Sequence, residues 1–126
     1  METGEAVSNF RWWKWLLAAL TATTLLAGCE SPSVYYWGHY EGLVYATYAH
    51  PGKVPPERQA ELMEEDLQKA ASANKPVPPG FHAHLGYVYY QMGKLDLAQK
   101  QFEAEKDLYP ESTVFMDRLL AGLVKK

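Results

Sequence analysis

Cysteine and histidine are the residue types in this sequence that could carry covalent or metal chemistry. The 126-residue chain contains one cysteine, Cys29, and four histidines. A thiolate can accept a covalent group, but a lone cysteine cannot form a disulfide within its own chain. His82 and His84 are separated by one residue, so on a helix they point to different sides and would not share a metal ion. The pattern predicts a modification at Cys29, with no metal site and no cofactor.

The segment before Cys29 has the features of an export signal. Basic residues precede the apolar stretch 16–28, LLAALTATTLLAG, which is too short to span a bilayer as a mature helix. The stretch ends in the residues 26–28, Leu-Ala-Gly, directly before Cys29. This junction resembles the lipobox of bacterial lipoproteins. An ordinary signal peptide, or a short anchor, with an incidental cysteine is the alternative.

The lipobox resemblance implies a protein that is anchored to a membrane. Residues 1–28 would be the signal peptide, and Cys29 would become the first mature residue with a diacylglycerol and an N-acyl chain. Two or more chains give stable anchoring to a lipid bilayer, where one gives only reversible binding. Glu30 follows the cysteine in place of the aspartate that often retains such proteins at the inner membrane. The resemblance thus implies the outer membrane, with the body of the protein on the periplasmic side.

The mature chain has the size of one small domain. Removal of residues 1–28 leaves 98 residues, and the net charge of the whole chain is −3. A mildly acidic chain without a cluster of basic residues argues against nucleic acid as a partner, because phosphate binding needs a basic face. We expect a tether at 29–34 and a helical domain at 35–126.

The first part of that domain predicts two helices. Trp37, Tyr40, Val44 and Tyr48 recur at three- and four-residue steps, which favours a helix over 37–49. Their rings could pack in a core or form a docking surface for a protein or a glycan. A second helix is expected over 57–73, with its run of acidic residues on a solvated face. Together the two helices predict a degenerate hairpin at 37–74.

The stretch 81–110 predicts a helix, a tight turn at Gly93-Lys94 and a second helix. Small and large residues alternate at positions where the two helices would meet: Leu85, Gly86, Tyr89, Ala98 and Phe102. The spacing resembles a tetratricopeptide (TPR) unit over 79–110. It departs from that pattern at His82, where Trp is commonest, and at Glu105, where a small residue is usual.

The TPR resemblance implies where a partner would bind. First helices of such units line a groove that holds a partner peptide, which makes Tyr87, Tyr90 and Gln91 candidate contacts. Plain surface residues are the alternative. A last helix over 112–124 carries more apolar residues than a terminal capping helix needs, so Phe115 and Leu119 are further candidates. The predicted fold is all-α: a short TPR-like helical-hairpin repeat of about five helices after a lipoprotein signal peptide.

Several motifs in the chain point to a family. They are the lipobox, WGxYE at 37–41, GFHAHLG at 80–86 and EKxxYPES…FMDRLL at 105–120. The chain resembles an uncharacterised family of small proteobacterial lipoproteins known as a domain of unknown function. Members are typically encoded beside a lipoprotein resembling the curli secretion channel, which implies a partner of that kind in the cell envelope.

Three classes of function can be weighed against these features. The preferred one is an outer-membrane lipoprotein that binds and assembles an envelope complex through protein–protein contacts. The alternative is a peptidoglycan- or glycan-binding lipoprotein that stacks sugar rings on Trp37 and the tyrosines. An enzyme would need a nucleophile with a positioned base, or a pair of buried carboxylates. The sequence does not display either pattern, so we predict that the protein is not an enzyme.

Overall fold

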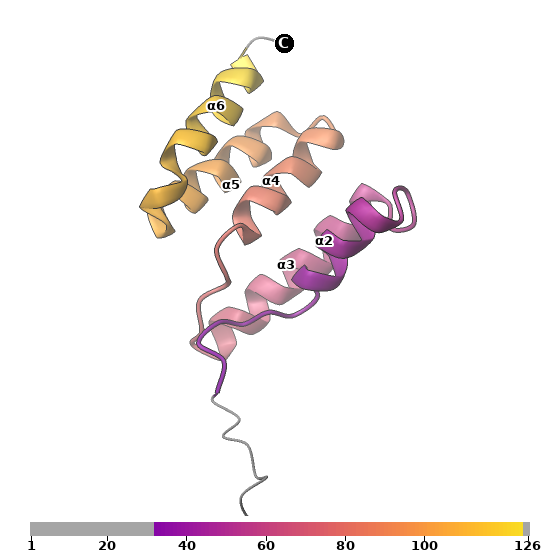
Figure 1. Ribbon diagram of the computed structural model, residues 1–126, viewed down its shortest axis with the longest axis vertical. Coiled ribbons are helices and arrows are strands. Elements are labelled where there is room, and N and C mark those ends of the chain that lie inside the picture. The colour runs from indigo at the N-terminus through magenta and orange to yellow at the C-terminus, as the bar shows by residue number, and fades with distance from the viewer. Residues whose placement is uncertain (1–31, 125–126) are drawn as a thin grey trace, which may run out of the picture. The chain divides into compact units, whose positions relative to one another are not determined.

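Five α-helices follow one another in residues 32–124, the part of the chain that the computed structural model describes (Figure 1). Their bounds are α2 (Tyr40–Ala49), α3 (Pro56–Ser72), α4 (Phe81–Gln91), α5 (Leu95–Leu108) and α6 (Thr113–Val124), with a short 3-10 turn η1 (Pro110–Ser112) between the last two. No strand occurs within residues 32–124, which confirms the predicted all-α class. The expected signal peptide and Cys29 lie outside the described residues.

Helices α4 and α5 form a hairpin around a close approach at Gly86. A Cβ atom on Gly86 would lie 2.5 Å from a ring carbon of Phe102 and 3.2 Å from the carbonyl oxygen of Ala98. Only a glycine leaves room for α5 to pack this tightly. The residues that the sequence placed between the two helices are all buried: Leu85, Gly86, Tyr89, Ala98 and Phe102. Figure 1 shows the two helices side by side, with α6 next to them.

Helix α2 begins later than the aromatic pattern suggested. The expected start was Trp37, whereas the helix begins at Tyr40. Gly38 interrupts it because its φ is +49°, in the left-handed region that other residues rarely adopt. The chain takes this turn because the Asp66 carboxylate occupies the space where a Cβ of Gly38 would lie, 2.3 Å away. Helix α3 agrees with its expected bounds to within one residue.

One core joins the helices. Phe81 and Leu85 of α4 are fully buried together with Met63 of α3 and Met116 of α6. Leu43 is the buried residue of α2. The apolar last helix thus contributes to the core through Met116, while its neighbour Phe115 stays exposed.

Two buried carboxylates hold the beginnings of helices. The first N–H groups of a helix have no partner within it and carry a partial positive charge, so a carboxylate there satisfies both needs. Glu105 of α5 accepts hydrogen bonds from the backbone N–H of Gly80 (2.6 Å) and of Ala83 (3.3 Å) at the start of α4. Asp66 of α3 accepts one from the N–H of His39 (2.6 Å) before α2.

Both findings revise the sequence-based expectations. Asp66 belongs to the acidic run that was expected on a solvated face, yet it is fully buried and also lies 3.0 Å from Nδ1 of His39. Glu105, which departs from the TPR pattern, is fully buried because the N-terminus of α4 needs its two oxygens.

Candidate binding groove

Helices α2, α4 and α6 together line a groove with a volume of about 450 Å³, which we call the central groove. It is formed by one face of each helix, so residues far apart in the sequence meet there. Its lining residues are Tyr40, Val44, Tyr48, Gly80, Ala83, His84, Tyr87, Phe115 and Leu119.

The lining of the central groove is apolar, aromatic and uncharged at neutral pH. Burial lowers the pKa of the His84 imidazole below its usual 6.5, so this ring is neutral. Burial, helped by the nearby Glu105 carboxylate, raises the pKa of the Tyr40 phenol above its usual 10.0. Tyr48 is 80% exposed and Phe115 is 59% exposed, so both rings are open to a partner.

Hydrogen bonds to Gln59 set the protonation of His84. The Gln59 amide nitrogen donates to the Val54 carbonyl (2.8 Å), which leaves the amide oxygen as an acceptor. Nε2 of His84 lies 3.1 Å from that oxygen and must carry the proton. In the neutral ring, Nδ1 is then a bare acceptor.

Two polar atoms of the central groove are available to a ligand. Within residues 32–124, neither Nδ1 of His84 nor the hydroxyl of Tyr40 has a hydrogen-bond partner. Neither atom is sealed from solvent, because no buried side-chain nitrogen or oxygen among the described residues lacks a partner. The two rings meet edge to face with centroids 6.2 Å apart. The groove thus offers one donor and one acceptor between aromatic walls.

The structure brings together some of the residues singled out in the sequence. Tyr87, Phe115 and Leu119 all line the central groove. Trp37 adjoins it, since its ring stacks on Tyr40 at a centroid distance of 6.5 Å and an interplanar angle of 23°. The indole N–H of Trp37 donates to the Ser33 hydroxyl (3.0 Å).

The remaining candidates lie elsewhere. The Gln91 side chain donates to the Tyr87 hydroxyl (3.3 Å) and lines a neighbouring hollow between α4 and the α2–α3 connection. Tyr90 is half-buried against the core and is not among the residues that line the central groove. Cys29 lies outside the described residues.

Sequence reasoning missed the ligand-facing role of His84 and Tyr40. His84 was considered only as a metal ligand, and Tyr40 only as part of an aromatic stripe. The spacing Tyr40–Val44–Tyr48 was a usable signal, because residues four apart share one helix face. Nothing in the sequence indicated that α6 would close the other side of that face.

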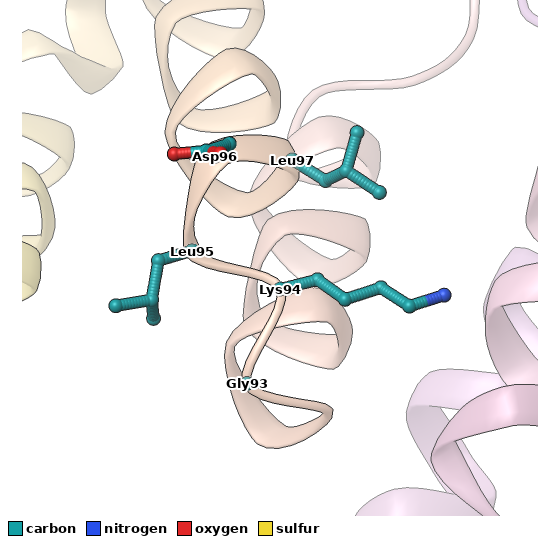
Figure 2. A pocket seen from close by; sticks show the side chains of 5 residues that line it. All are labelled: Gly93, Lys94, Leu95, Asp96 and Leu97. Carbon is teal, nitrogen blue, oxygen red and sulfur yellow. The ribbon is translucent and has the colours of Figure 1, made fainter.

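Other surface features do not form a site. A hollow of about 410 Å³ at the α4–α5 turn is lined by the consecutive residues 93–97 alone. Figure 2 shows that the side chains of Lys94 and Leu95 point away from each other, so no polar groups converge there. Within residues 32–124 no group of three potential metal ligands occurs, and no helix is long and apolar enough to cross a membrane.

These features define a small all-α protein with an uncharged, aromatic-lined groove. The chain belongs to the family described as Domain of unknown function (DUF4810), whose model matches residues 34–119. The matched region covers all of α2 to α5 and most of α6. No curated protein matches the chain, and no solved structure does.

Proposed function

We propose that this protein is an interaction module of the cell envelope. An acylated Cys29 anchors it in the outer membrane on the periplasmic side, and its TPR-like helical domain binds a partner protein and helps to assemble a complex. A lipoprotein resembling the curli secretion channel is the first partner to test, because the family resemblance implies that such a protein is encoded nearby. The proposal includes no catalysis and no nucleic acid.

The central groove is the observation that supports this proposal. Exposed apolar surface costs free energy in water, and covering it contributes about 25 cal/mol per Å². Aromatic side chains dominate the energetic centres of protein interfaces, because they bury a large area at a small cost in side-chain entropy. Tyr48 of α2 and Phe115 of α6 present such rings on two separate helices.

Anchoring strengthens a weak contact. A short tether over 29–34 would keep the domain close to the bilayer and raise the local concentration of any partner in the same membrane. A moderate affinity in the groove would then suffice for a stable assembly.

The test is a pull-down of the tagged full-length protein from gently solubilised membranes, followed by mass spectrometry and by binding measurements on the purified partner. The variants Tyr48→Glu and Phe115→Glu place a charge in the groove. The controls Tyr45→Glu and Val114→Glu alter residues of the same helices that are 65% and 68% exposed and do not line the groove.

A stoichiometric partner that is retained by both controls and lost with both groove variants would support the proposal. Equal recovery with all four variants would exclude the groove as the contact. Extraction of the protein into the aqueous phase without detergent, unchanged by Cys29→Ser, would exclude the lipid anchor.

Exposed tyrosine rings favour a second candidate, binding of peptidoglycan or another glycan. Tyr48 is 80% exposed, and flat aromatic rings can stack on sugars. Co-sedimentation with purified peptidoglycan, abolished by Trp37→Ala or Tyr48→Ala, would favour this candidate over the first. The absence of co-sedimentation would remove it.

A further inference from the structure

We infer that the central groove binds an internal, uncharged segment of extended polypeptide, with a bulky apolar side chain against Phe115 and a main-chain amide pair on Tyr40 and His84. This inference rests on the proposed interaction function and specifies the chemistry of its ligand. Four properties of the groove support it.

The first property is the pairing of one donor with one acceptor. The Tyr40 hydroxyl can donate to a carbonyl oxygen, and Nδ1 of His84 can accept from an N–H. In an extended chain, the N–H and C=O of a single residue point to the same side. One residue of a bound strand could therefore engage both groups, which lie on rings whose centroids are 6.2 Å apart.

The second property is the absence of charge among the residues that line the groove. A terminal carboxylate placed there would lose its hydration without gaining a cationic partner, and an ammonium group would lack an anionic one. Glu105 is the nearest carboxylate to Tyr40, but it is fully buried and occupied by the N–H groups of Gly80 and Ala83. An internal segment with uncharged side chains avoids this cost.

The third property is the apolar wall supplied by α6. Phe115 is 59% exposed on that wall, and Tyr87 of α4 is 44% exposed on the floor. A large apolar side chain between these rings would bury much of its surface. Alternate residues of an extended segment point to opposite faces, so its other side chains could remain in solvent.

The fourth property separates a peptide from a sugar. A pyranose ring buries several hydroxyl groups, each of which costs about 1–3 kcal/mol if it is left without a partner. The groove offers only the Tyr40 hydroxyl and Nδ1 of His84 as unpartnered polar atoms. Apart from the Tyr48 and Tyr87 hydroxyls at its rim, no carboxylate or carboxamide side chain lines it to satisfy a sugar.

The test measures binding of the full-length protein, in mild detergent, to fluorescein-labelled hexapeptides. One set carries a central Phe, Leu or Tyr among Ala, Ser and Thr, with an acetylated N-terminus and an amidated C-terminus. A second set has the same sequences with a free C-terminal carboxylate next to the apolar residue. A labelled tetramer of N-acetylglucosamine provides the glycan arm.

We expect the blocked peptides to bind, with Kd below about 1 mM, and to bind more tightly than the carboxylate set. Tyr40→Phe removes only the hydroxyl and should weaken binding about 3- to 10-fold, the effect of one hydrogen bond. Phe115→Ala should weaken it at least about 10-fold. The matched variant Tyr45→Phe, which alters a hydroxyl outside the groove, should leave it unchanged.

Failure of every blocked peptide to bind, preference for the free carboxylate, or equal binding by Tyr40→Phe, Phe115→Ala and Tyr45→Phe would overturn the inference. Binding of the glycan tetramer that competes with the peptides would also overturn it. If the peptides fail while a native partner is still lost with Phe115→Glu, the interaction function stands and the ligand class is wrong. If that partner also fails to appear, both proposals fall. Circular dichroism of each variant checks that its helices are intact.

Discussion

Replacement of Glu105 by alanine is the sharpest test of how this fold is held together. Glu105 is fully buried, and its two carboxylate oxygens accept the N–H groups of Gly80 and Ala83 at the start of α4. Helix α4 carries half of the polar groups proposed for the groove. Loss of the carboxylate should therefore loosen both the hairpin and the floor of the groove.

The magnitude follows from the two hydrogen bonds. A hydrogen bond to a charged group contributes about 1.5–3 kcal/mol, and the longer bond to Ala83 belongs at the lower end of this range. Alanine leaves both N–H groups without a partner and removes the carboxylate from the positive end of the α4 dipole. We expect Glu105→Ala to lower the free energy of unfolding by about 3–5 kcal/mol. For a domain of this size, such a loss lowers Tm by about 12–30 °C.

The assay is urea and thermal unfolding followed by circular dichroism, with amide hydrogen exchange as a local measurement. The N–H groups of Gly80 and Ala83 should lose protection more than amides in α3. Glu105→Gln keeps the volume but turns one acceptor into a donor, so it should cost about half as much as alanine. Glu103→Ala alters an exposed residue of the same helix and should change stability by less than about 0.5 kcal/mol.

A loss of less than about 1 kcal/mol for Glu105→Ala would refute the reasoning, because two buried donors cannot lose a charged acceptor so cheaply. The same conclusion would follow if Glu105→Gln matched the native protein, since the amide cannot accept both hydrogen bonds.

Three other predictions follow from single contacts. Gly38→Ala should destabilise the fold by about 2–4 kcal/mol in urea unfolding because of its φ of +49° and the clash with a carboxylate; Gly42→Ala, in open space within α2, should instead stabilise it by about 0.5–1 kcal/mol, and equal effects would contradict this account. The folded pKa of His84 lies below its unfolded value of 6.5, so the protein should lose stability as the pH falls below about 6.5 and be insensitive to this group above it. An NMR titration of the His84 ring with a midpoint above 6.5 would reverse the sign. Tyr89→Phe removes a hydroxyl that donates to Glu64, and should cost about 1–2 kcal/mol by thermal unfolding, against no cost if that hydrogen bond is not formed in solution.

Much of the helical arrangement could be predicted from local patterns. The bounds of α3 and the α4–α5 hairpin follow from apolar periodicity, from the turn at Gly93-Lys94 and from the spacing of Leu85, Gly86 and Phe102. The start of α2 could not be predicted in this way. Gly38 breaks the aromatic stripe because of the Asp66 carboxylate, which is 27 or 28 residues away in the chain, and no local pattern shows such a contact.

The candidate site was only partly accessible to sequence reasoning. Tyr87, Phe115 and Leu119 were singled out as exposed or surplus apolar residues, and they meet in the central groove. Tyr90 was placed with them by analogy, but it is half-buried against the core because its position on α4 faces other helices. A residue's partners depend on which neighbours cover its side of the helix, which the residue's own spacing does not determine.

The sequence by itself determined the all-α class, the order of the helices and the surplus of aromatic and apolar residues, because these depend on residue type and on short-range spacing. Tertiary structure alone decided which carboxylates are buried and which polar atoms are left for a ligand. Glu105 and Asp66 look like surface acids until the helix N-termini that they serve are folded against them. His84 becomes a neutral acceptor only after Gln59 binds its other nitrogen.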